Sequence, residues 1–264
     1  MSDMFLPPGF DISIAREAAQ LVVQAYDQFA AFKSKTAWSL QGNYNNLQTL
    51  HARPEGLFAE LEPFGFVAQN KASGNLFVTF RGTDSPEDWI SNATINHTAH
   101  PWGPVEDGFS KLYAQCSADV IAAVKSAPGT PTIFVTGHSL GAALSTLATA
   151  DVFIHGLSAQ LYNFASPRTG SPDFAAQFNQ KVAVAWRTVN TEDIVTTIPI
   201  ATPTLASGKP SHGLFGILIG LAPKLNFEHV GSPVNFTTFN GSILGNHQMA
   251  TYVAALSAAK AAAV

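Results

Sequence analysis

One serine in the chain lies in a pattern that is typical of a nucleophile. Gly137, Ser139 and Gly141 form Gly-x-Ser-x-Gly between a β-branched apolar run at residues 132–136 and an Ala- and Leu-rich segment at residues 142–154. These flanking segments predict a buried strand and a buried helix. A sharp turn between them would present the serine hydroxyl at the carboxyl end of a sheet, as in a nucleophile elbow. The alternative is a serine in an ordinary loop, because the bare pattern also occurs by chance.

The acidic partner is expected to follow the serine in the chain. A serine hydroxyl needs a base to take its proton, and the elbow-type hydrolases order the three residues as Ser, acid, His. Glu192 and Asp193 come directly after a predicted strand at residues 182–189, at the sheet edge that also carries Ser139. Apolar residues follow Asp193 and would fix it, so Asp193 is the expected acid. A solvated turn is the alternative for this pair.

Three histidines, His212, His229 and His247, follow the expected acid. His247 lies in a Gly-Asn-His loop from which it can reach back over the sheet edge, so it is favoured as the base. His229 precedes a turn and a late strand, and it is expected to serve that turn. His138 flanks the nucleophile but should project from the other side of the elbow, where a structural hydrogen bond is expected.

The expected reaction also needs two donors for an oxyanion. The first is expected to be the backbone N–H of Leu140, at the start of the helix behind the nucleophile. The second is expected from the Arg-Gly-Thr loop that follows an earlier strand. Gly82 would let the backbone approach closely, and Thr83 would supply its N–H and a hydroxyl.

The remaining segments predict one α/β domain over residues 1–264, because no repeat or linker-like run divides the chain. Strands and helices alternate from about residue 132 onward, which favours parallel pairing with right-handed crossovers. The other expected elements are a helix capped by Asp11, a hairpin of residues 65–69 and 76–80, one helix over residues 109–125, a late strand at residues 234–239 and a last helix that opens at His247.

Composition and charge exclude several partners. The formal net charge is −4, and only 12% of the residues are charged, so the chain lacks the basic surface that nucleic-acid binding requires. The longest apolar run, residues 213–222, is too short to span a bilayer. Residues 1–13 do not resemble a Sec signal. The localisation therefore stays open between the cytoplasm and secretion by another route or after removal of a signal.

Metal and cofactor sites are not expected. Cys116 is the single cysteine, so a disulfide within the chain and a Cys-rich metal site are excluded, and an unreactive buried thiol is expected. His97 and His100 are close together, but no His-Glu-x-x-His pattern accompanies them. A metal hydrolase is therefore the weaker alternative.

The motifs also follow one another in a familiar order. They are Phe-Arg-Gly-Thr at residues 80–83, Gly-His-Ser-Leu-Gly-Ala-Ala-Leu at 137–144, Ser-Pro-Arg at 166–168, the segment around Asp193, and His-Gln-Met at 247–249 with Tyr252. Over about residues 65–252 the chain resembles the class 3, or fungal-type, lipases. The resemblance implies an α/β-hydrolase fold, with a mostly parallel central sheet flanked by helices and a short helical lid. One departure is Glu106, where many members carry a histidine.

The resemblance places the lid at about residues 85–98. Ser85, Pro86 and Asp88 are typical of a helix start, and Trp89, Ile90 and Ala93 would lie on one narrow face of that helix. An apolar insertion at about residues 211–225 separates the acid from the base. It is expected to form a wall of the acyl site with Leu214, Phe215 and Leu218, and the alternative is an ordinary buried helix.

These observations together favour a serine hydrolase of carboxylic esters, with a triacylglycerol lipase as the leading expectation. The expected partners are a lipid or other ester and, transiently, a lipid–water interface. A feruloyl or aryl esterase and a phospholipase are alternatives within the same family. A binding protein for apolar ligands without catalysis is the remote alternative.

Overall fold

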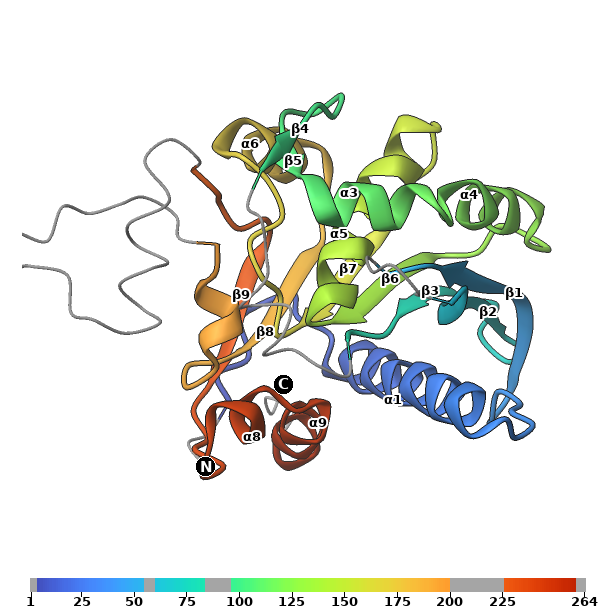
Figure 1. The fold of residues 1–264 in the computed structure, drawn as a ribbon, viewed down its shortest axis with the longest axis horizontal. Coiled ribbons are helices and arrows are strands. Elements are labelled where there is room, and N and C mark those ends of the chain that lie inside the picture. Colours follow the sequence, from blue (N-terminus) through green and yellow to red (C-terminus); the bar gives the residue numbers. More distant parts are fainter. Residues whose placement is uncertain (1–3, 55–59, 84–95, 200–225, 260–264) are drawn as a thin grey trace, which may run out of the picture.

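The computed structural model describes residues 4–54, 60–83, 96–199 and 226–259, and a seven-stranded sheet forms its centre (Figure 1). The first three neighbours in the sheet pair antiparallel, and the pairs from β3 to β9 are all parallel. The mostly parallel sheet that the sequence predicted is therefore confirmed. The strands, in their spatial order, are β1 (Tyr44–Ala52), β2 (Glu62–Asn70), β3 (Leu76–Phe80), β6 (Ile133–His138), β7 (Gln160–Phe164), β8 (Ala185–Asn190) and β9 (Ser232–Phe236).

Helices cover both faces of the sheet (Figure 1). One face carries α1 (Ile12–Ser34), the short α8 (Ile243–His247) and α9 (Met249–Ala258). The other carries α3 (Asp107–Ala114), α4 (Ser117–Ser126), α5 (Leu140–Ile154) and α6 (Pro172–Lys181). Each layer buries its own apolar cluster against the sheet. Asp11 caps α1 as expected, because its carboxylate accepts the N–H groups of Ser13 and Ile14.

Two expectations about the elements were wrong in detail, and one strand was missed. The edge strand β1 was not predicted, because its half-exposed sequence is polar at many positions. The single helix expected over residues 109–125 is two helices, and no glycine or proline marks the break at Cys116. His247 ends α8 instead of opening the last helix.

The predicted lid and apolar insertion fall mainly outside the described residues. Trp89, Ile90, Leu214, Phe215 and Leu218 all belong to these undescribed ranges. The last part of the lid range is described, and there His97–Thr98 form the strand β4, paired antiparallel with β5 (Val105–Glu106).

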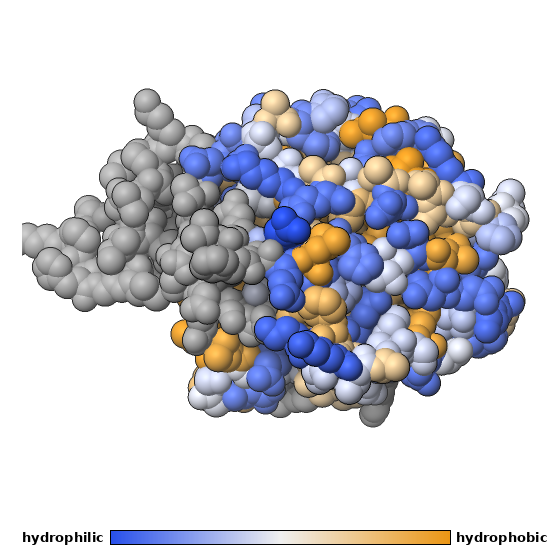
Figure 2. All heavy atoms as spheres, turned by 45° about the vertical axis from the view of Figure 1, so that its right-hand side comes forward, coloured by the Kyte–Doolittle hydropathy of each residue, from blue (hydrophilic) through white to orange (hydrophobic). Residues whose placement is uncertain are grey.

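The described surface mixes apolar and polar side chains, and the orange residues in Figure 2 form small patches between blue ones. The most exposed large apolar side chains are Phe5, Leu61, Phe239 and Ile243. Among the described residues, no helix is both long and apolar enough to cross a membrane.

Glycines allow three backbone segments to meet where the chain turns from β6 into α5. A Cβ atom on Gly137 would lie 2.1 Å from the carbonyl oxygen of Gly141. A Cβ atom on Gly141 would lie 2.6 Å from the oxygen of Phe80 and 2.4 Å from that of Arg81, at the end of β3. Only residues without a side chain fit these positions, so β3, β6 and α5 can approach to backbone contact.

We therefore expect Gly141→Ala to destabilise the fold by more than about 3 kcal/mol, because backbone atoms cannot give way as flexible side chains do. Denaturant unfolding measures this loss. Gly156→Ala, just after the other end of α5, is the control. Gly156 has a φ of +78° and no atom within 4 Å of the added carbon, so a loss of only about 1–2 kcal/mol is expected. Equal losses at both positions would contradict the tight packing.

Candidate active site

Ser139 lies at the turn between β6 and α5 on strained backbone. Its φ of 57° and ψ of −126° are unusual for a residue with a side chain, and the residue is fully buried. Its N–H donates to the carbonyl oxygen of Phe164 at 3.1 Å, which ties the turn to β7. Leu140 is the first residue of α5, so its N–H is one of the donors that have no partner within a helix.

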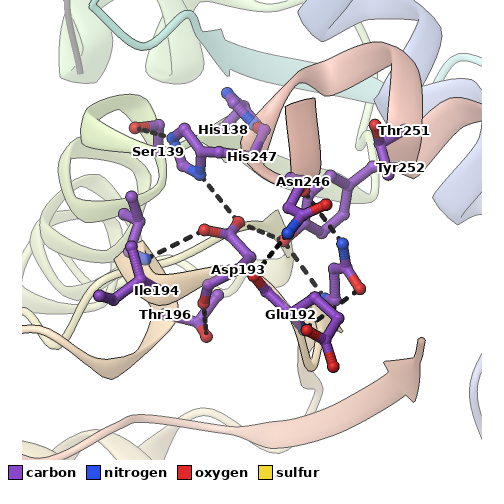
Figure 3. A network of polar contacts seen from close by, with 12 residues as sticks. His138, Ser139, Glu192, Asp193, Ile194, Thr196, Asn246, His247, Thr251 and Tyr252 are labelled. Carbon is purple, nitrogen blue, oxygen red and sulfur yellow. Dashed lines mark hydrogen bonds and ion pairs between the residues drawn. The ribbon is translucent and has the colours of Figure 1, made fainter. Parts of the chain in front are cut away.

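Ser139, His247 and Asp193 form one chain of hydrogen bonds (Figure 3). The Nδ1 atom of His247 is 2.8 Å from Oδ2 of Asp193, and its Nε2 atom is 2.7 Å from the serine Oγ. An ionised carboxylate only accepts hydrogen bonds, so Nδ1 carries the proton and Nε2 of the neutral ring accepts the serine hydroxyl. This is the hydrogen-bond geometry of a Ser-His-Asp triad.

Asp193 is held in place by two further donors. The residue is 1% exposed, at the start of the 3₁₀ helix η1 (Ile194–Thr197), and its Oδ1 accepts the N–H of Val195 at 3.0 Å. The hydroxyl of Tyr252 donates to its Oδ2 at 2.6 Å. Burial and the charge of Asp193 raise the pKa of Tyr252 well above its ordinary value, so this hydroxyl keeps its proton. In the sequence, Tyr252 stands out only as part of a motif, and nothing there indicates this contact.

Two asparagines join the segments that carry Asp193 and His247, and Asn246 lies between these segments in Figure 3. The amide of Asn190, the last residue of β8, donates to the carbonyl oxygen of Asn246 at 3.1 Å. The amide of Asn246 donates in turn to the carbonyl oxygen of Glu192 at 3.0 Å. Because Asn246 precedes His247 and Glu192 precedes Asp193, these bonds fix the relative positions of acid and base.

The rings of His229 and His138 each hydrogen-bond to a backbone carbonyl oxygen. The Nε2 atom of His229 is 2.8 Å from the carbonyl oxygen of Thr196. Burial, followed by the positive charge of Arg187, lowers the pKa of His229 to about 3. His138 hydrogen-bonds to the carbonyl oxygen of His247 through Nε2, at 2.8 Å.

The loop after β3 lies directly against the elbow. A Cβ atom on Gly82 would be 2.9 Å from Cβ of Ser139, so the backbone that leads to Thr83 passes close to this serine. Arg81 stabilises this loop from within the core by donating to the carbonyl oxygens of Pro63 and Gly82, at 2.8 and 2.7 Å. Its guanidinium also pairs with Glu62. In the sequence, Arg81 belongs to the Phe-Arg-Gly-Thr motif, and its residue type alone does not indicate this buried position.

His97 and His100 do not form a metal site with carboxylates in the part of the chain that the structure describes. Among the residues that the structure describes, no group of three or more His, Cys, Asp or Glu side chains could hold a metal ion. His97 contacts the ring of Phe227, and His100 that of Phe174. Glu106, the residue that departs from the family pattern, accepts the N–H of Phe109 at 2.7 Å and caps α3.

Comparison with known proteins also finds lipases. The family model of class 3 lipases matches residues 77–202. A secreted mono- and diacylglycerol lipase of Fusarium solani is 31% identical over 140 residues, which cover 51% of this chain and 42% of the relative. A lipase of Rhizomucor miehei is 33% identical over 147 residues, covering 51% and 40%. The match thus spans less than half the length of each of these curated relatives.

A solved structure extends the likeness to most of the fold. It is described as a triacylglycerol lipase whose catalytic centre is a serine protease triad, and it aligns with a TM-score of 0.62 and 24% identity. The alignment covers 75% of this chain and 78% of the other. The family match, the relatives and the shared architecture lead to one conclusion: over residues 77–202 the chain matches the class 3 lipases, and its fold is that of the α/β-hydrolases.

Proposed function

We propose that this protein hydrolyses carboxylic esters, as a lipase of acylglycerols. The hydrogen-bond chain from Asp193 through His247 to Ser139 is the observation that carries the proposal. Each of the three residues is at most 2% exposed, and two hydrogen bonds connect their side chains. The names of a mono- and diacylglycerol lipase and a triacylglycerol lipase among the matched proteins support this substrate class. Two plant relatives are named phospholipase A1, so a phospholipid is the first alternative substrate to test.

The proposed reaction has two steps. The serine Oγ attacks the ester carbonyl while Nε2 of His247 takes its proton, and Asp193 stabilises the resulting imidazolium. The N–H groups of Leu140 and Thr83 bind the oxyanion of the tetrahedral intermediate. Its collapse expels the alcohol, which receives the proton from His247, and leaves an acyl-enzyme. Water then attacks the acyl group with the same histidine as base, and the free acid and the serine hydroxyl are released.

A hydrolysis panel tests this substrate class. Esters of short to long acyl chains, a phospholipid and a feruloyl ester should be compared under one set of conditions. We expect the highest kcat/KM for acylglycerols. Preference for the feruloyl ester or the phospholipid would assign the chain to one of the alternative activities. The absence of turnover on every ester would contradict hydrolysis and favour a binding protein for apolar ligands.

The triad makes a direct prediction. Ser139→Ala should lower kcat by roughly 10⁶ with the fold intact, because the base has no hydroxyl left to activate. His247→Ala should cost about as much. His229→Ala is the matched control, since it also removes a buried ring that hydrogen-bonds to a carbonyl, and it should retain most of kcat. An inactive His229→Ala beside an active His247→Ala, with both variants folded by circular dichroism, would overturn the assignment of the base.

A second prediction concerns the Thr83 hydroxyl. Thr83→Ala retains the backbone donor and removes only the side-chain oxygen. If this oxygen binds the oxyanion, kcat should fall by up to roughly 10²–10³-fold, the effect of losing a full donor. KM should change little, because the contact tightens in the transition state. Thr83→Ser should restore the rate. An unchanged kcat in Thr83→Ala would show that the backbone N–H acts without the hydroxyl.

A further inference from the structure

His138 is a second buried histidine at the site, and the proposed reaction does not use it. Its ring lies beside that of His247, with centroids 4.8 Å apart. Its Nε2 atom is 2.8 Å from the carbonyl oxygen of His247. A carbonyl oxygen can only accept, so Nε2 of His138 must carry a proton and donate it to this bond.

The other ring nitrogen fixes the direction of the next hydrogen bond. Burial, followed by the nearby His247, lowers the pKa of His138 well below its ordinary value, so the ring is neutral and its Nδ1 is an acceptor. The hydroxyl of Tyr26, from α1, lies 2.8 Å from this atom and must donate to it. The same hydroxyl oxygen accepts the N–H of Gly82 at 3.0 Å.

These bonds form one chain with a defined direction. It runs from the N–H of Gly82 to the Tyr26 hydroxyl, on to Nδ1 of His138, and from its Nε2 to the carbonyl oxygen of His247. Gly82 precedes the expected oxyanion residue Thr83, and His138 precedes the nucleophile Ser139. The chain thus connects the backbone of three separate segments, which supply the oxyanion donor, the nucleophile and the base.

We propose that Tyr26 and His138 are positioning residues. They hold the loop of residues 81–83, here called the oxyanion loop, and the proposed base His247 at fixed distances from Ser139. The inference rests on the proposed ester hydrolysis. Neither side chain is assigned a contact with the substrate, and each acts through the backbone of a neighbouring residue. An oxyanion donor works only within about 2.7–3.1 Å of its target. A small shift of the Gly82 backbone would therefore destabilise the transition state more than it weakens substrate binding.

Tyr26→Phe is the simplest test, since it retains the ring and removes the hydroxyl. It leaves the Gly82 N–H and His138 Nδ1 without this partner. We expect kcat to fall about 10-fold, the scale of one buried hydrogen bond, while KM stays nearly constant. Tyr113→Phe is the matched control, because its hydroxyl donates to Asp151 at the same distance of 2.8 Å. Asp151 lies about 18 Å along α5 from the elbow, so this variant should retain kcat.

Two substitutions of His138 test the two ends of the hydrogen-bond chain one at a time. His138→Gln can place an amide donor near the carbonyl oxygen of His247, and His138→Asn can place a polar group near the Tyr26 hydroxyl. Each should lower kcat more than KM changes. Tyr26→Phe combined with His138→Gln should cost less than the product of the two single effects, because both remove the same contact. Fully independent effects would contradict a continuous chain.

A measurement without substrate separates this inference from the proposed function. Imidazole ¹⁵N NMR should show His138 as the neutral Nε2–H tautomer from pH 5 to 8. A charged ring or the Nδ1–H tautomer would overturn the inference, whether or not esters are hydrolysed. Ester turnover with equal kcat for wild type, Tyr26→Phe and Tyr113→Phe would also overturn it. A wild-type protein that hydrolyses no ester would instead contradict the proposed function, and the NMR result would still decide the tautomer.

Discussion

The site depends on one close approach of backbone segments, at the point where β6 turns into α5 against the end of β3. Gly82, Gly137 and Gly141 have no room for a side chain, because an added carbon would lie within 3 Å of neighbouring atoms. This contact sets the distance between the oxyanion loop and Ser139. It also places the start of α5, with the N–H of Leu140, directly behind the nucleophile.

Asp193 and His247, the proposed acid and base, reach this point from segments that lie much later in the chain. Burying the carboxylate of Asp193 would be costly without partners, and His247, Tyr252 and the N–H of Val195 supply them. These hydrogen bonds hold the imidazole of His247 in one orientation, with Nδ1 toward Asp193 and Nε2 toward Ser139. The fixed geometry means that little reorganisation is needed when the proton moves.

Local sequence identified the residues whose surroundings are set by neighbours in the chain. The elbow of Ser139 could be predicted because strand, turn and helix are contiguous, and Asp193 could be placed because it follows a strand. The contacts of Tyr26 and Tyr252 could not, since they join residues 112 and 59 positions apart. The strand β1 was not predicted, because apolar and polar residues need not alternate cleanly in an edge strand. The helix break at Cys116 carries no signal in the residue types, and tertiary packing decides it.

The central claim is that Ser139 is an activated nucleophile in this chain. A fluorophosphonate reacts with such a serine by losing fluoride and forming a stable phosphonyl ester, and intact-mass and peptide mass spectrometry locate the adduct. We expect one adduct per molecule, on the peptide that contains Ser139, and a loss of labelling when the protein is unfolded first. Labelling of a different residue, or a folded protein that takes up no phosphonate, would contradict it.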